Sequence, residues 1–176
     1  MLALCLLLAA EVPGGFATAS SQSLFFDHPV IRRGFHFQVA FGIGGGPENE
    51  GLFHAMEIGG TFDNGLTVGL LHTFVQNKGV IGPERGPDLL GGWMLELKVP
   101  LFFPEFDLKL AAGLGGLHDQ SDGIRFLPGL GWSYGLDVHL PFFDDSGLTF
   151  GFSMIQVVVD GTHYLSAATS LGYTFF

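Results

Sequence analysis

Six charged side chains and one histidine share a spacing that places them in one cluster. They are Glu57, Glu96, Lys98, Asp107, Lys109, Asp137 and His139. Six of them form three pairs separated by a single residue, so both members of each pair point to one face of a β-strand. Opposite charges on a buried face neutralise one another and satisfy their hydrogen-bonding needs. The pattern predicts a lumen charge cluster acting as a polar plug, with an ion or proton pathway as the alternative.

Alternating strands are the elements that must position these charges. Apolar residues recur at every second position, between glycine-rich or polar turns such as Asp63-Asn64-Gly65 and Asp160-Gly161. Each stretch is about ten residues long, which matches a tilted membrane-spanning strand. The eight stretches are 34–44, 52–62, 66–76, 89–99, 106–117, 128–140, 148–158 and 163–176. The sequence predicts an all-β fold, an eight-stranded antiparallel up-and-down transmembrane β-barrel.

Composition agrees with a barrel whose outside faces lipid. Hydrophobic residues make up 47% of the chain and charged residues 14%, against about 25% charged in typical soluble domains. Within the strand cores the charges fall on the face opposite the large apolar residues. A lipocalin-like soluble barrel, the alternative fold, would have its apolar face inside. The net charge of −10 argues against nucleic-acid binding.

The N-terminal segment has the features of a secretory signal. Leu2 to Ala10 form an apolar core, and Ala17-Thr18-Ala19 fits a small-residue cleavage site, although no Lys or Arg precedes the core. We expect residues 1–19 to be a signal peptide and 20–176 the barrel domain. The one cysteine, Cys5, lies within this signal, so no disulfide is expected.

The inward face raises two further expectations. Register counted across the turn at residues 100–105 places Lys98 roughly opposite Asp107. Toward the outer mouth of the barrel many inward positions hold small residues. Two hypotheses explain them: glycine permits strong curvature of the wall, or the small residues leave a ligand pocket. These positions are Gly42, Gly44, Gly92, Gly113, Gly115, Gly129, Gly131 and Gly151.

The last strand ends in the aromatic sequence GYTFF. A strand that ends this way needs a partner, which closure against the first strand supplies. With the signal-like start and the eight alternating strands, this ending resembles the small eight-stranded outer-membrane barrels: the OmpA membrane domain, OmpX, Ail and OmpW. The resemblance implies that a C-terminal aromatic is the assembly signal. Tyr173, Phe175 and Phe176 are the candidates, with Phe176 out of phase with the apolar alternation.

The resemblance also implies a function. We expect a non-enzymatic protein of a Gram-negative-type outer membrane, with a structural or surface-interaction role, a narrow lumen, no cofactor and a monomeric state. Its partners would be outer-membrane lipids and the barrel assembly machinery. A small-ligand or lipid-related channel, as in OmpW, is the alternative. A lipid A-modifying enzyme is the third hypothesis, because His118-Asp119-Gln120-Ser121 supplies suitable residue types.

The histidines suggest no metal site, because none of the seven has a tight ligand spacing. His54 and His72 fall on the outward face. We expect them at the outer interface of the membrane, where they meet lipid head groups.

Overall fold

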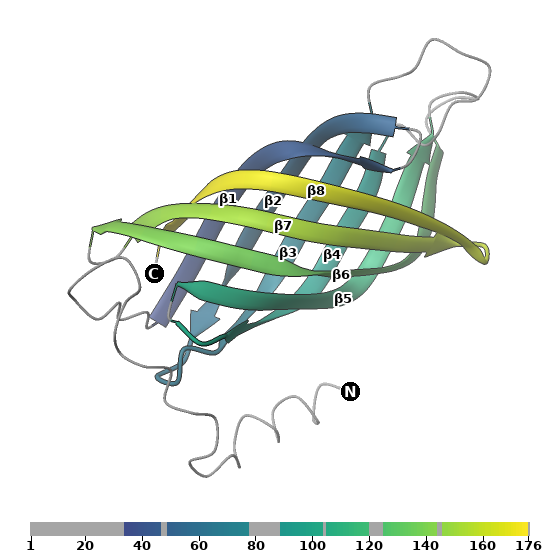
Figure 1. Cartoon of the computed structure of the whole chain (residues 1–176). Helices are drawn as coiled ribbons and strands as arrows, with labels where there is room; N and C mark the ends of the chain where they lie inside the picture. Colours follow the sequence, from purple (N-terminus) through teal and green to yellow (C-terminus); the bar gives the residue numbers. More distant parts are fainter. Residues whose placement is uncertain are drawn as a thin grey trace.

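The computed structural model describes the backbone of residues 34–46, 49–77, 89–103, 105–119, 125–143 and 146–175. The expected signal peptide and residues 20–33 lie outside this part of the chain. The described residues form eight strands (Figure 1). They are β1 (Gly34–Gly46), β2 (Asn49–Thr61), β3 (Thr67–Asn77), β4 (Leu89–Pro100), β5 (Phe106–Asp119), β6 (Arg125–Phe143), β7 (Ser146–Val159) and β8 (Thr162–Phe175). No helix in the described residues is long and apolar enough to span a membrane.

The strands close into one antiparallel barrel in the order β1 to β8. Each strand pairs with the next one along the chain, and β8 returns to pair with β1, from Phe37↔Phe175 to Gly45↔Ala167. We call the end of the barrel that carries Gly34 and Phe175 the terminal end, and the opposite end the loop end (Figure 1). Closure gives every strand two hydrogen-bonded neighbours, so the fold has no free edge. The predicted fold class is confirmed.

Two predicted hairpin turns have the backbone that their residues favour. At the β7–β8 turn, Asp160 and Gly161 both have positive φ, 49° and 79°, the combination that a two-residue type I′ turn requires. At the β2–β3 turn, Gly65 has φ 81°, and its N–H donates to the carbonyl of Phe62 at 2.9 Å. Both turns reverse the chain within a few residues and so fix the register of their strands.

Several strands extend beyond their predicted bounds. β5 and β6 stay in register as far as Asp119↔Arg125, so part of the polar stretch expected to be a loop, 118–125, is strand. β6 also continues past Leu140 to Phe143, with a register shift between Pro141 and Phe143. The backbone groups that make a ladder are present whatever the side-chain polarity. The alternation of side chains therefore predicted these strands to be shorter than they are.

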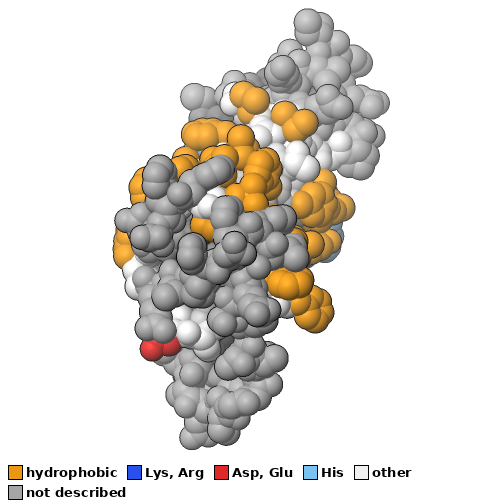
Figure 2. Space-filling model, turned by 60° about the vertical axis from the view of Figure 1, so that its left-hand side comes forward, with side chains coloured by type: hydrophobic (Ala, Val, Ile, Leu, Met, Phe, Trp, Pro, Cys, Tyr) orange, Lys and Arg blue, Asp and Glu red, His pale blue; other side chains and the backbone are white. Residues whose placement is uncertain are grey.

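The two faces of the wall differ as the alternation predicts. Large apolar side chains cover the outside, and Ile43 and Leu114 are 70% and 72% exposed. Figure 2 shows such side chains in orange on the outside of the barrel. The charged residues of the strand cores all point inward and are buried: Glu57, Glu96, Lys98, Asp107, Lys109 and Asp137. An apolar outside and a charged inside is the arrangement of a barrel in lipid.

Close approach of neighbouring strands explains some of the inward glycines. A Cβ atom on Gly42 would lie 1.8 Å from the carbonyl oxygen of Thr169, and one on Gly92 would lie 2.0 Å from that of Leu114. No other residue fits such contacts without movement of the backbone. These two positions support the hypothesis that glycine permits a narrow, strongly curved barrel.

Candidate functional site: the filled lumen

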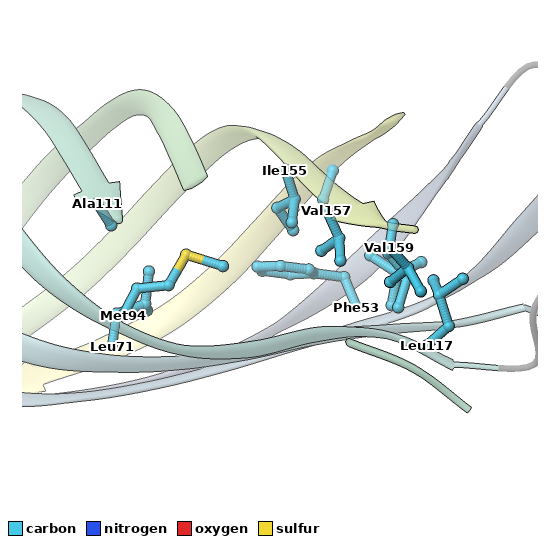
Figure 3. Close-up of a cluster of buried hydrophobic side chains, with 11 residues drawn as sticks. Phe53, Leu71, Met94, Ala111, Leu117, Ile155, Val157 and Val159 are labelled. Carbon is cyan, nitrogen blue, oxygen red and sulfur yellow. The ribbon is translucent and has the colours of Figure 1, made fainter. Parts of the chain in front are cut away.

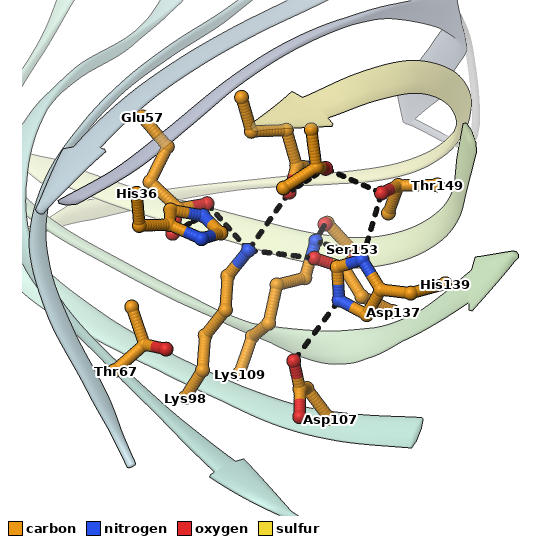
Figure 4. A network of polar contacts seen from close by, with 12 residues as sticks. His36, Glu57, Thr67, Lys98, Asp107, Lys109, Asp137, His139, Thr149 and Ser153 are labelled. Carbon is orange, nitrogen blue, oxygen red and sulfur yellow. Dashed lines mark hydrogen bonds and ion pairs between the residues drawn. The ribbon is translucent and has the colours of Figure 1, made fainter. Parts of the chain in front are cut away.

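A network of polar side chains crosses the lumen in the terminal half of the barrel (Figure 4). Its members come from seven of the eight strands, all except β3, and each occupies an inward position of its strand. They are His36, Gln38, Glu57, Lys98, Asp107, Lys109, Asp137, His139, Thr149, Ser153 and Thr174. We call this set the ionic layer. Every one of these residues is at most 9% exposed.

Lys98 is the centre of the ionic layer. Its ammonium group lies 2.5 Å from Glu57 Oε2 and 3.0 Å from Asp137 Oδ2. It also donates a hydrogen bond to Gln38 Oε1 at 2.9 Å. The three contacts use the three donors of an ammonium group. Burying a charge is costly unless it is paired and hydrogen-bonded, and Lys98, which is fully buried, meets both conditions.

Asp137 joins the two lysines. Its Oδ2 contacts Lys98, and its Oδ1 lies 2.7 Å from Lys109 Nζ. Lys109 also donates to Ser153 Oγ at 3.0 Å. One carboxylate thus bridges two cations that project from neighbouring strands, and Glu57 supplies the second negative charge, at Lys98.

The expected pairing of Lys98 with Asp107 is wrong. Lys98 lies directly opposite Lys109, and Asp107 lies opposite Pro100. The reason is the length of the β4–β5 turn: the Leu101 N–H bonds to the Phe106 carbonyl, so four residues, 102–105, form the connection. The expected turn, 100–105, would have placed Val99 opposite Phe106. Because pairing instead continues two residues further, to Leu101, each residue of β4 faces a partner two positions later in β5.

Two histidines extend the ionic layer. His36 Nε2 lies 2.8 Å from Glu57 Oε1. His139 contacts Asp107 Oδ2 through Nε2 at 2.9 Å and Thr149 Oγ1 through Nδ1 at 2.8 Å. With the two lysines, these imidazoles give each inward carboxylate of the layer a basic partner.

A chain of hydroxyl groups closes the ionic layer across the β1–β8 seam. Thr149 Oγ1 lies 2.5 Å from Thr174 Oγ1, and Thr174 in turn donates to Gln38 Oε1 at 3.2 Å. Gln38 also accepts from Lys98. The first and last strands are therefore joined through side chains as well as through the backbone.

A second set of side chains fills the lumen toward the loop end (Figure 3). Phe53, Met94, Ile155 and Val157 approach one another from β2, β4 and β7. The buried members of this apolar layer are Phe53, Leu71, Val75, Leu90, Met94, Ala111, Leu117, Ile155, Val157, Val159 and Ala168. Inward glycines leave room for these side chains. A Cβ atom on Gly131, for example, would lie 2.9 Å from Met94 Cε.

Only a small space separates the two layers. A cavity of about 10 Å³ is lined from one side by Phe53 and Leu71 and from the other by Glu57, Glu96 and Lys109. That volume is about the minimum for one water molecule. Glu96 is buried here, and its Oε2 has no hydrogen-bond partner. Large apolar side chains occupy part of the region in which the second hypothesis for the inward glycines placed a ligand pocket.

All seven predicted charges of the cluster are inward and buried, and six make the ion pairs described above. Sequence reasoning missed the whole apolar layer and five members of the ionic layer: His36, Gln38, Thr149, Ser153 and Thr174. A signal for the apolar layer exists: at Leu70-Leu71 and in the run from Val157 to Val159, apolar residues occupy both faces. Such a run marks a strand segment buried on one face and in lipid on the other.

The last strand makes the expected contact with β1. Phe175 lies opposite Phe37, with 6.3 Å between the ring centroids. Tyr173 packs against Phe175, with 4.9 Å between the ring centroids, and its hydroxyl group is hydrogen-bonded to Ser146 Oγ at 2.9 Å.

Some of the predicted residues lie outside the described part of the chain: Phe176, Gln120, Ser121 and the side chains of His118 and Asp119. Among the described residues, no group of three His, Cys, Asp or Glu side chains is placed to hold a metal ion.

These features define a class of protein, the small closed eight-stranded antiparallel barrel with an apolar outside. Two solved structures are similar. Neisserial surface protein A, NspA, matches with a TM-score of 0.54 and 17% identity, over 80% of this chain and 96% of that one. Ail, the attachment invasion locus protein of Yersinia pestis, matches with a TM-score of 0.45 and 13% identity, over 82% of this chain and 99% of that one.

The match to NspA shows that this chain has the fold of a small outer-membrane barrel. No family model and no curated protein sequence matches the chain. The shared feature is therefore the architecture, and the lumen and surface of this chain have to be interpreted from its own residues.

Proposed function

We propose that this chain is a non-enzymatic protein of a Gram-negative-type outer membrane, with a structural or surface-interaction role and a lumen closed to solutes. The observation that carries the proposal is the double filling of the lumen. The ionic layer and the apolar layer lie in series along the barrel axis, with a cavity of about 10 Å³ between them. An eight-stranded barrel has an interior just wide enough for its own side chains.

The apolar outside supports the membrane part of the proposal. Exposed aromatic and aliphatic side chains on all eight strands would aggregate in water, and lipid removes that cost. The name of NspA, a surface protein, agrees with a role at the cell surface. On this proposal the chain acts as a monomer, the terminal end faces the periplasm, and the assembly machinery inserts the barrel.

A conductance measurement tests the closed lumen. The refolded protein is inserted into a planar bilayer, and the same sample is checked for its folded form by comparing boiled and unboiled lanes on a gel. We expect heat-modifiable mobility and no steady current. A steady current, or flux of a small solute from loaded liposomes, would support the alternative channel function and contradict the closed lumen.

A separate assay addresses enzymatic activity. Lipid A is incubated with the folded protein and then analysed by mass spectrometry. We expect an unchanged mass. Gain of an acyl chain or loss of one would show a lipid A-modifying enzyme instead.

A further inference from the structure

Two histidines lie in a row of rings on the outside of the barrel, across β1 to β4. His54 lies between Phe41 and Phe74, with ring centroids at 4.9 and 5.0 Å. His72 stacks against Trp93 at 4.3 Å. The two imidazole rings are 6.3 Å apart. The row is thus a pair of imidazoles side by side within an aromatic surface.

The position of the pair is unusual for an ionisable group. Outward positions between residues 35–43, 52–62, 66–76 and 89–99 hold no Asp, Glu, Lys or Arg, so the two histidines stand alone in an apolar surface. A polar ionisable group that faces lipid is costly and is by default a candidate functional residue. His54 Nδ1 is buried and has no hydrogen-bond partner. Among the described residues, the ring neighbours of His54 thus leave its Nδ1 without a hydrogen bond.

The depth of the pair places it in the loop-end half of the apolar belt. His54 is five positions from Asn49, the loop end of β2, and His72 is five positions from Asn77, the loop end of β3. At about 3.3 Å per residue and a strand tilt of about 40°, five positions correspond to about 13 Å of depth below the strand ends. Leu52 is the one outward apolar residue between His54 and the loop end of β2, and on β3 only Phe74 lies between His72 and the polar Gln76. The pair therefore lies near the loop-end margin of the apolar belt, where a lipid-facing group comes within reach of the head groups.

The residues around His54 and His72 favour an anion as the ligand of the pair. A protonated His72 is stabilised by the face of Trp93 through a cation–π contact. No carboxylate among the described outward residues of β1 to β4 neutralises the pair, so its counter-ion has to come from outside the protein. Two adjacent imidazole rings fit an anion with several acceptor oxygens, because each ring can donate a hydrogen bond to a different oxygen of the same group. In a membrane, the group with this chemistry is the phosphate of a lipid.

We propose that His54 and His72 form a binding site for the phosphate group of a membrane lipid, which is occupied when the imidazoles are protonated. The inference rests on the proposed membrane insertion of the barrel. Phe41, Phe74 and Trp93 bound the site and contact the apolar part of the same lipid. The site makes the contact of the barrel with its lipid dependent on pH.

The binding measurement uses the fluorescence of Trp93 in the full chain, with Trp132→Phe introduced to remove the other indole. The protein is folded in zwitterionic micelles and titrated with bis-phosphorylated lipid A or with the same lipid after removal of its phosphates. We expect the phosphorylated lipid to bind about tenfold tighter near pH 5.5 than near pH 8, the effect of one charge-assisted hydrogen bond. The dephosphorylated lipid should show no such difference.

Matched variants test whether His54 and His72 cause the pH dependence of lipid binding. His54→Gln with His72→Gln should abolish the pH dependence. The variant His163→Gln is the control. His163 also lies on the outside near an indole, with 6.4 Å between its ring centroid and that of Trp132, but its ring is hydrogen-bonded to Gln156. Because Trp132 is part of this environment, the control retains Trp132, and its lipid binding is measured by native mass spectrometry. It should retain the pH dependence.

Two results would overturn this inference alone: equal binding of both lipids by the protein folded in micelles, or pH dependence retained in the double variant. Failure of the wild-type chain to insert into phospholipid vesicles, seen as the absence of a heat-modifiable band, would overturn the proposed function as well. The gel shift of the double variant shows separately whether it folds.

Discussion

Lys98 and Lys109 face each other directly across the β4–β5 pair, and both ammonium groups contact the carboxylate of Asp137 on β6. Like charges directly opposite each other normally destabilise a sheet. Here the third strand supplies the compensating charge, so the pair depends on barrel curvature that brings β6 over β4 and β5.

Removing that shared carboxylate should be strongly destabilising. We expect Asp137→Asn to lower the free energy of unfolding by about 3–5 kcal/mol, because two lysines then lose their common partner in a buried site. Urea titration followed by the gel shift of folded protein measures it. Asp160→Asn is the matched control, since Asp160 is exposed in a turn and Asn tolerates its positive φ; a loss of similar size there would contradict the assignment.

The two layers of the lumen should close it independently. We expect Phe53→Ala with Ile155→Ala to leave the bilayer current near zero, because the ionic layer remains in series with the enlarged space. Each truncation also costs stability, about 3–5 kcal/mol for Phe53→Ala.

Opening both layers in one protein is the complementary experiment. Adding Glu57→Ala and Lys98→Ala to the two apolar truncations should give a measurable single-channel conductance, provided that the gel shows folded protein. Steady conductance from the apolar truncations alone would show that the ionic layer does not close the lumen.

The β7–β8 turn should depend on Gly161. With φ at 79°, replacement by valine forces a β-branched residue into a left-handed conformation, at about 1–3 kcal/mol. Gly161→Asn is the matched substitution and should cost less, because Asn visits this region more readily. Equal midpoints in urea for the two variants would contradict this backbone argument.

The terminal aromatics can be separated experimentally. Phe175 contacts both Phe37 and Tyr173, so Phe175→Ala should weaken closure of the barrel in the purified protein. Deletion of Phe176 should instead impair membrane assembly in cells while refolding in detergent stays close to normal. Normal insertion after that deletion would assign the assembly signal to Tyr173 and Phe175.

Much of the ionic layer was predictable because strand alternation has a fixed period of two. That period put Glu57, Asp137 and the neighbouring charges on the inner face whatever the details of pairing. The partner of each charge was not predictable, since the four-residue β4–β5 turn moved Lys98 from Asp107 to Lys109. A shift of two positions preserves the face and changes the partner.

The sequence by itself determined that eight alternating strands carry their charges on one side and their large apolar residues on the other, because these are local properties of each strand. Only the tertiary structure decided that Lys98 meets Glu57 and Asp137 from distant strands, and that Phe53 and Ile155 fill the lumen beyond them. Such contacts cross the barrel, and their geometry follows from closure, stagger and curvature.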